Sequence, residues 1–165
     1  MKTIILDGYN VIHKMPGMKK KLAESLEVAR KTLAVYLSGW RRRYPDAEVS
    51  IVFDGKDSEF PGGQKTSIAG IRCIFTRSNE TADERIISLI RNSQNPRNIT
   101  VITEDNSIRN SSRAHRAEVK AIDFLLPRGK KKEKTSKGRD KITPPVNTNR
   151  VTDYYEDYLR NAGKI

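Results

Sequence analysis

This sequence has little of several features that define whole classes of protein. It holds one cysteine, Cys73, in 165 residues, so no internal disulfide can form and a disulfide-stapled secreted scaffold is excluded. Its two histidines, His13 and His115, have no partner spacing that suggests a zinc site or a catalytic triad. No apolar run approaches the length of a membrane span, and the apolar run before Asp7 is too short for a signal-peptide core. We therefore expect a cytoplasmic protein with no membrane partner.

Positive charge is what the chain has in excess. Hydrophobic residues make up 36% and charged residues 32%, so the chain is polar, but it is long enough to bury one core. Lys and Arg number 32 against 20 Asp and Glu, which gives a net charge of +12. This excess favours a polyanionic partner, with nucleic acid ahead of an anionic membrane surface.

Short apolar runs alternate with amphipathic stretches over residues 1–127, which predicts one α/β domain with a mainly parallel sheet and helices on both faces. The expected strands are 4–6, 48–53, 71–76, 98–103 and 119–126. The expected helices are 19–43, 81–92 and 106–115, the last capped by Asn106. Residues 13–17 and the polar stretch 57–70 are expected to be loops.

The composition changes after residue 127. Residues 128–141 contain eight basic and two acidic residues and no apolar side chain, so we expect 128–150 to be a basic flexible segment. Its lysines, among them Lys130, Lys131 and Lys132, are expected to attract phosphates without sequence preference. Residues 151–165 are expected to form a C-terminal helix that docks back on the domain through tyrosine and leucine side chains.

Acidic residues follow several of the predicted strands. Asp7 comes directly after the first apolar run, Asp54 follows the second strand, and Asp105 follows the fourth. Asp83 lies in the first turn of a predicted helix, with Glu80 about one turn before it. Because the carboxyl ends of parallel strands meet at one sheet edge, where open α/β sheets bind ligands, we expect these acids to converge.

Carboxylates that gather at one place need a counter-ion. Two unit charges ~4 Å apart repel by about 4 kcal/mol at an effective dielectric constant of ~20. Hard divalent cations prefer oxygen ligands, and a bound cation can activate water and stabilise the charge of a phosphoryl displacement. An acidic cluster in a basic chain therefore predicts hydrolysis of phosphodiester bonds. The candidate metal ligands are Asp7, Asp54, Glu80, Asp83 and Asp105.

Each acid also has an ordinary structural interpretation. Asp7 and Asp54 both precede glycine, and Asp-Gly is a common turn dipeptide. Asp83 lies where the helix dipole favours acids anyway, and Asp105 is in a position to cap a helix. Only the joint pattern favours a metal, because independent turns would not all fall at the same sheet edge.

Residues near the acids are candidates for contact with a substrate. Asn10 suits a hydrogen bond to substrate and a loop amide equally, and Tyr9 suits base stacking but is better explained by packing beside the strand. Thr103 is explained equally by water positioning and by its place in a strand. The arginines that could contact phosphate are Arg77, Arg109, Arg113 and Arg116, although solvated helix charges are the usual case.

Together, four motifs resemble a known family. They are Asp7-Gly8-Tyr9-Asn10, Phe53-Asp54-Gly55, Glu-Thr-Ala-Asp-Glu-Arg-Ile at 80–86, and Thr103-Glu104-Asp105. Their order and context, over about residues 1–126, resemble the NYN domain of the PIN-like nuclease superfamily, most closely its YacP-like branch. The resemblance implies a three-layer α/β/α fold with about five strands, dependence on Mg²⁺ or Mn²⁺, and cleavage of RNA without a nucleotide cofactor.

The resemblance also implies roles for single residues. It makes Asp7, Asp83 and Asp105 the catalytic acids, with Asn10 and Asp54 in support. Glu104 departs from the family pattern, in which a small residue is commoner before the last acid.

These observations predict a metal-dependent endoribonuclease in mRNA decay or RNA processing. Some related proteins work with the ribosome, which makes the ribosome a candidate partner. Two alternatives stay open: a non-catalytic RNA- or ribosome-binding protein that keeps the acids as a relic, and a DNA-directed nuclease of the same fold.

Overall fold

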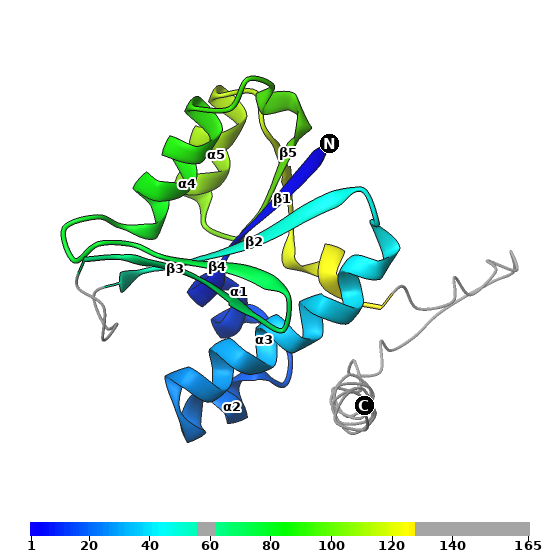
Figure 1. Cartoon of the computed structure of the whole chain (residues 1–165), viewed down its shortest axis with the longest axis vertical. Coiled ribbons are helices and arrows are strands. Elements are labelled where there is room, and N and C mark those ends of the chain that lie inside the picture. The colour runs from blue at the N-terminus through cyan, green and yellow to red at the C-terminus, as the bar shows by residue number, and fades with distance from the viewer. Residues whose placement is uncertain (56–61, 128–165) are drawn as a thin grey trace, which may run out of the picture.

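A sheet between two layers of helices makes up the part of the chain that this computed structural model describes, residues 1–55 and 62–127 (Figure 1). The strands are β1 (Lys2–Asp7), β2 (Ala47–Phe53), β3 (Gln64–Ile68), β4 (Ile71–Phe75), β5 (Ile99–Ile102) and β6 (Glu118–Lys120). The α-helices are α1 (Gly8–Lys14), α2 (Met18–Glu24), α3 (Leu26–Trp40), α4 (Ala82–Arg91) and α5 (Asn106–Ala114). Single 3₁₀ turns lie at Arg41–Arg43, Pro96–Asn98 and Ile122–Leu125.

The strands lie in the order β3-β4-β2-β1-β5-β6, and every neighbouring pair is parallel except β3 and β4. At the centre, Leu6 of β1 lies between Ile51 of β2 and Ile102 of β5. Parallel pairing brings the carboxyl ends of these strands to one edge of the sheet. The predicted α/β class is confirmed, and β3 adds an antiparallel strand at the border of the five parallel ones.

The central strand β1 is buried on both faces, as its unbroken apolar run predicts. Ile4 and Leu6 pack in one cluster with Leu33 of α3, whereas Ile5 packs in a second cluster with Ile86 of α4. Helices α1, α2 and α3 therefore cover one face of the sheet, and α4 and α5 cover the other (Figure 1). This is the predicted three-layer arrangement.

The helices before β2 differ from the prediction. In place of one helix over 19–43, the chain forms α2 and α3, which meet at Ser25. Ser25 is extended, and its hydroxyl accepts a hydrogen bond from the backbone N–H of Val28, so it caps α3. An additional helix, α1, begins directly after Asp7 and takes in part of the expected loop. The apolar stripe runs across Ser25 because α2 and α3 pack on the same core, so periodicity alone misses the break.

Two other predicted elements were partly wrong. Residues 64–68, expected in a loop, form β3 and pair antiparallel with β4. This border strand alternates between exposed and half-buried residues, so it lacks the apolar run of a central strand. The predicted strand 119–126 is limited to Glu118–Lys120, and the chain then forms a 3₁₀ turn whose Ile122 and Leu125 join the α3 side of the core.

Residues 128–165 lie outside the described residues, and so do residues 56–61. The predictions of a basic segment at 128–150 and of a helix at 151–165 fall in that region. Over the described ranges, none of the helices has both the length and the apolar character that a bilayer span requires.

Candidate active site

Asp7 is the buried acid of the carboxyl edge of the sheet. It ends β1 and precedes α1, and only 7% of its surface is exposed. The Thr103 hydroxyl donates a hydrogen bond to its Oδ2 atom over 3.3 Å. The pKa of Asp7 is raised to about 6, mainly because burial disfavours the charged form. The backbone of Asn10 and the Thr103 hydroxyl lower this pKa, while the charges of Asp83 and Asp105 raise it.

The motif at residues 80–86 is explained by the start of α4. The Thr81 hydroxyl accepts a hydrogen bond from the backbone N–H of Glu84 over 3.2 Å, and the Glu84 carboxylate accepts one from the backbone N–H of Thr81 over 2.9 Å. This capping box fixes where the helix begins. Ala82 packs in the core, and Asp83 takes no part in the cap. The carboxylate of Asp83 is therefore available for another role.

Four aspartates share one electrostatic environment. The pKa of Asp83 is raised first by partial burial and then by the negative charges of Asp105 and Asp54. Asp7 is affected by Asp83 and Asp105 in the same way. The four residues come from the ends of β1, β2 and β5 and from the start of α4. The fold thus brings acids that are far apart in the sequence near one another at a single sheet edge.

Asn10 and Thr103 join α1 to the loop after β5. The side-chain carbonyl of Asn10 accepts a hydrogen bond from the backbone N–H of Glu104 over 2.8 Å and lies 3.3 Å from the Thr103 hydroxyl. The Thr103 hydroxyl accepts a hydrogen bond from the backbone N–H of Asp105 over 3.1 Å. Its single proton can go to Asp7 or to Asn10. Asn10 and Thr103 therefore hold the Asp7 and Asp105 segments together.

Asp105 caps α5, where the sequence predicted Asn106 as the cap. Its Oδ1 atom accepts hydrogen bonds from the backbone N–H groups of Ser107 and Ile108, at 2.8 and 3.1 Å. Both bonds use the same oxygen, so capping does not require Oδ2. Asp105 therefore does cap a helix, as its structural interpretation states, and its second carboxylate oxygen is left for a cation.

Glu104, which departs from the family pattern, binds protein groups on both of its oxygens. Oε1 accepts a hydrogen bond from the backbone N–H of Ile122 over 2.9 Å, and Oε2 pairs with Arg109 over 3.3 Å. Glu104 thus connects the loop after β5 to the 3₁₀ turn after β6. Arg109, a predicted phosphate contact, is engaged in this ion pair.

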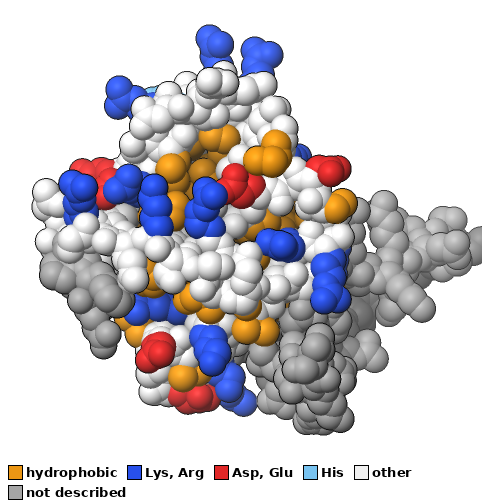
Figure 2. Space-filling model, in the orientation of Figure 1, with side chains coloured by type: hydrophobic (Ala, Val, Ile, Leu, Met, Phe, Trp, Pro, Cys, Tyr) orange, Lys and Arg blue, Asp and Glu red, His pale blue; other side chains and the backbone are white. Residues whose placement is uncertain are grey.

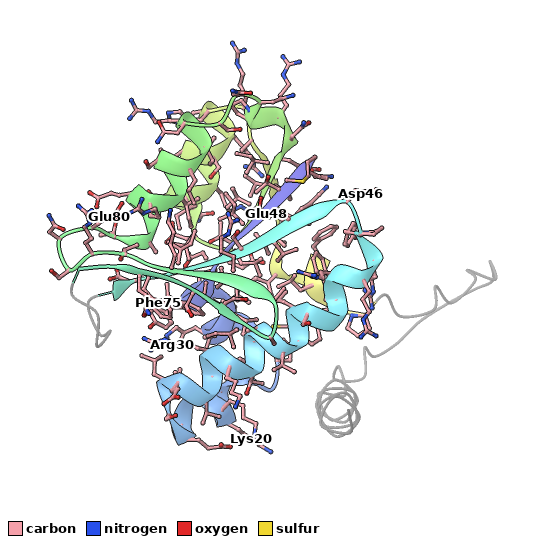
Figure 3. The ribbon with its side chains drawn as sticks, in the orientation of Figure 1. Lys20, Arg30, Asp46, Glu48, Phe75 and Glu80 are labelled. Carbon is pink, nitrogen blue, oxygen red and sulfur yellow. The ribbon has the colours of Figure 1, made fainter. Side chains whose placement is uncertain are left out.

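Other predicted site residues have other partners within the protein or are exposed. Glu80 pairs with Arg85 at 2.7 Å near the start of α4 (Figure 3). The Tyr9 ring packs on Phe53, with centroids 5.2 Å apart, and its hydroxyl accepts hydrogen bonds from the Arg30 guanidinium. Figure 3 shows Arg30 beside Phe75 on the α3 side of the sheet. Arg77, Arg113 and Arg116 are exposed, and Lys130, Lys131 and Lys132 lie outside the described residues.

The two Asp-Gly pairs need glycine for space, which sequence reasoning missed. A Cβ on Gly8 would lie 2.4 Å from the Phe53 ring, and one on Gly55 would lie 1.8 Å from the carbonyl oxygen of Thr76. The backbone N–H of Gly55 also donates a hydrogen bond to the Thr76 hydroxyl over 2.8 Å. Thr76 directly follows β4, and Thr103 directly follows β5. A threonine directly after an apolar run is the sequence signal that could have identified Thr76 and Thr103 as residues that support the acidic segments.

We call the carboxyl edge of the sheet, with Asp7, Asp54, Asp83 and Asp105, the acidic edge. Its residues fit a hydrated divalent cation better than a site in which protein ligands alone surround the metal. Within 1–55 and 62–127, no three Asp, Glu, His or Cys side chains are grouped closely enough to hold a metal ion together. Mg²⁺ usually takes one or two carboxylates and completes its shell with water and phosphate oxygens, and Mn²⁺ also prefers oxygen ligands. The raised pKa of Asp7 reflects burial and negative neighbours, and a nearby cation would offset both.

Comparisons with known proteins agree with this fold. The model of the YacP-like NYN domain matches residues 4–161. "Uncharacterized protein YacP" of Bacillus subtilis (strain 168) is 32% identical over 156 residues, which cover 86% of this chain and 89% of that protein. A crystal structure of a mutant of Rae1 (YacP) from Bacillus subtilis has a TM-score of 0.63 at 26% identity, and the match covers 98% of this chain and 80% of that one. A second Rae1 (YacP) structure from Bacillus subtilis, with a TM-score of 0.59 at 23% identity over 99% and 80% of the two chains, shows the same fold. The chain therefore belongs to the YacP-like NYN domain family.

Proposed function

We propose that this protein is a metal-dependent endoribonuclease that hydrolyses RNA phosphodiester bonds at the acidic edge of its sheet. NYN domains belong to the PIN-like nuclease superfamily, so membership supports a hydrolase that acts on nucleic acid. The observation that carries the finer proposal is the electrostatic interaction of Asp7, Asp83 and Asp105, which come from three distant segments. A site that repels its own carboxylates has a physical reason to bind a cation.

Each acid has a proposed part in holding the ion. Asp7, Asp83 and Asp105 would hold one or two Mg²⁺ or Mn²⁺ ions, directly or through water, and Asp54 would support them from the end of β2. When bound, such an ion lowers the pKa of a water molecule and stabilises the charge that develops on the phosphate. Glu80 is left out of this set because its carboxylate binds Arg85 at 2.7 Å.

The remaining predicted residues divide between support and substrate binding. Asn10 and Thr103 would orient the acids through the hydrogen bonds that join their segments. Arg77 and Arg113 are exposed and would contact RNA phosphates, and Lys130, Lys131 and Lys132 would add sequence-independent attraction. Action in the cytoplasm, in mRNA decay or RNA processing, and association with the ribosome belong to the same proposal and rest on the family resemblance.

Cleavage by purified acid-to-amide variants tests the proposal. The wild-type protein should cut RNA in Mg²⁺ or Mn²⁺ and not in EDTA. Asp7→Asn and Asp83→Asn should each lose at least about 10- to 100-fold in rate, the loss that even outer partners of a metal site cause. The matched control is Asp46→Asn, an exposed acid that precedes β2 at the opposite sheet edge (Figure 3). Wild-type cutting by both site variants, above the level of a contaminating nuclease, would refute the assignment.

The same assay separates the two alternatives. A non-catalytic RNA- or ribosome-binding protein would not cut RNA, whichever metal is added. It would bind RNA equally well with and without the acids. A DNA-directed nuclease would cut a DNA of matched sequence faster than the RNA. The proposal therefore requires metal-dependent cutting, preference for RNA, and loss of cutting in the acid variants.

A further inference from the structure

We infer that a small cationic pocket beside the acidic edge binds a backbone phosphate of the RNA strand. This inference rests on the proposed function and adds a second anchor point for the same substrate. The pocket has a volume of about 160 Å³ and lies between the β3–β4 hairpin and α4. Three basic side chains line it: Lys65 of β3, Arg77 just after β4, and Arg85 of α4. In Figure 2, Lys and Arg side chains gather on this face of the molecule, between α4 and the hairpin.

Sheet topology places the pocket on the same edge as the acids. Lys65 pairs with Ile74 near the carboxyl end of β4, and β4 neighbours β2, which leads into Asp54. The next strand is β1, which ends at Asp7. Because neighbouring strands lie ~4.8 Å apart, the pocket is about 10–15 Å from Asp7 along the edge. A single strand of RNA with one phosphate at the acids would therefore reach the pocket within a short stretch.

Arg85 has an unmet hydrogen bond that a phosphate oxygen would complete. Its Nη2 atom donates to the Glu80 carboxylate over 2.7 Å. Its Nε atom is buried and has no hydrogen-bond partner among the described residues. A buried donor without an acceptor is unfavourable, so an anion that reaches this atom from the pocket would supply the missing partner. Arg85 is held by its hydrogen bond to Glu80, so it is a less mobile cation for the pocket than a free surface arginine would be.

The other two cations give the pocket a net positive charge. Lys65 and Arg77 are exposed, and neither makes an ion pair with another residue of 1–55 or 62–127. Gly63 packs against Arg77 so closely that a Cβ there would lie 3.1 Å from the Arg77 Cγ atom. Gly63 also has a φ of +78°, which favours glycine. A side chain at position 63 would crowd the Arg77 stem, so glycine leaves room for Arg77 beside the pocket.

RNA binding without cleavage tests the inference. Affinity for a single-stranded RNA oligonucleotide is measured in EDTA by fluorescence anisotropy, over a series of salt concentrations. Lys65→Ala and Arg77→Ala should each weaken binding several-fold and lower the slope of log K against log salt by about 0.7, the value for one lost contact with a single strand. The matched control is Arg97→Ala, an exposed arginine in the 3₁₀ turn before β5, at the opposite sheet edge. It should change neither quantity.

The outcomes separate this inference from the nuclease proposal. Wild-type affinity and slope in both pocket variants would overturn the inference even if the protein cuts RNA. Pocket-dependent binding by a protein that never cuts RNA would uphold the inference and refute the nuclease proposal. Oligonucleotides with a 5′ hydroxyl or a 5′ phosphate form a further arm. A loss seen only with the 5′ phosphate would assign the pocket to an RNA end and overturn the assignment to a backbone phosphate.

Discussion

The hydroxyl of Thr103 donates a hydrogen bond to the carboxylate of Asp7 over 3.3 Å, although 96 residues separate the two in the chain. The contact is possible because β1 and β5 are parallel neighbours, with Leu6 beside Ile102. It orients Asp7 in a position where burial raises its pKa to about 6. The hydrogen bond lowers that pKa but does not cancel the effect of burial, so the ionised Asp7 remains unfavourable without a cation.

The first prediction concerns stability and pH. Because the folded pKa of Asp7 is raised from 3.8 to about 6, the folded state binds the proton more tightly than the unfolded chain does. The stability linked to this proton is complete below about pH 4 and is lost as pH rises through 6; it amounts to about 3 kcal/mol at 1.36 kcal/mol per pH unit. Asp7→Asn should therefore raise the free energy of unfolding at pH 7.5, by up to that amount, and not at pH 4.

Urea unfolding in EDTA at the two pH values measures this difference. Asp46→Asn, at an exposed position, should change the free energy of unfolding by no more than about 0.5 kcal/mol at either pH. A destabilisation by Asp7→Asn that is equal at pH 4 and pH 7.5 would show that burial of the Asp7 charge does not limit stability.

The second prediction concerns metal binding. A cation at the acidic edge binds the folded state and not the unfolded chain, so it should raise the melting temperature of the wild-type protein. At a concentration 100 times the dissociation constant the stabilisation is about 2.7 kcal/mol. Asp7→Asn and Asp83→Asn should reduce the shift produced by Mg²⁺ or Mn²⁺, and Asp46→Asn should not. Thermal unfolding with each metal and with EDTA makes the comparison. Equal shifts in all four proteins would place the metal elsewhere.

The third prediction concerns the glycines after the acids. Gly8→Ala would push a methyl group into the Phe53 ring, and Gly55→Ala would push one into the Thr76 carbonyl, so each should destabilise by about 1–3 kcal/mol or more. Gly62→Ala is the control, because none of the described residues has an atom within 4 Å of a Cβ at that position. Chemical denaturation of the three variants gives the ranking. If Gly62→Ala is as harmful as Gly55→Ala, close packing is not the reason for the glycine.

The layout of the acids could be predicted because it depends on one short-range rule. Apolar runs mark the parallel strands, and the residue at the end of each run lies at the carboxyl edge of the sheet, as with Asp7 and Asp54. The roles of their neighbours could not be predicted, because these roles depend on contacts between distant segments. Nothing local to Glu104 indicates that its partner is the backbone of Ile122. Likewise, β3 is recognisable only through its pairing with β4, since its own residues are polar.

The break at Ser25 was missed although its signal is local. The cap signal is local, but the apolar spacing on either side continues because α2 and α3 pack on one core. Periodicity measures which face is buried and not whether the backbone is continuous. The sequence therefore predicted the layer correctly and the helix boundaries wrongly.

The fourth prediction concerns Glu104 and separates support from metal ligation. Glu104→Ala would leave the backbone N–H of Ile122 without its acceptor and should cost about 1–3 kcal/mol of stability. Glu104→Gln keeps an acceptor oxygen, so it should retain most of the stability and also the metal-induced shift in melting temperature. Glu24→Ala, which removes one partner of an exposed ion pair with Lys21, should cost no more than about 1 kcal/mol. Loss of the metal shift in Glu104→Gln would instead identify Glu104 as a ligand.

The fifth prediction concerns residues 128–141, whose eight basic and two acidic residues follow the domain. Each phosphate contact that this segment makes should contribute about 0.7 to the slope of log K against log salt for single-stranded RNA. Replacing the segment with a neutral Gly/Ser linker of equal length should therefore weaken binding and flatten that slope, while it leaves the melting temperature of the domain unchanged. Anisotropy titrations in EDTA measure both quantities, and the Lys65→Ala variant provides the scale for one lost contact. A wild-type slope in the linker variant would show that the segment's charge does not contact RNA, and attraction would then depend on the domain alone.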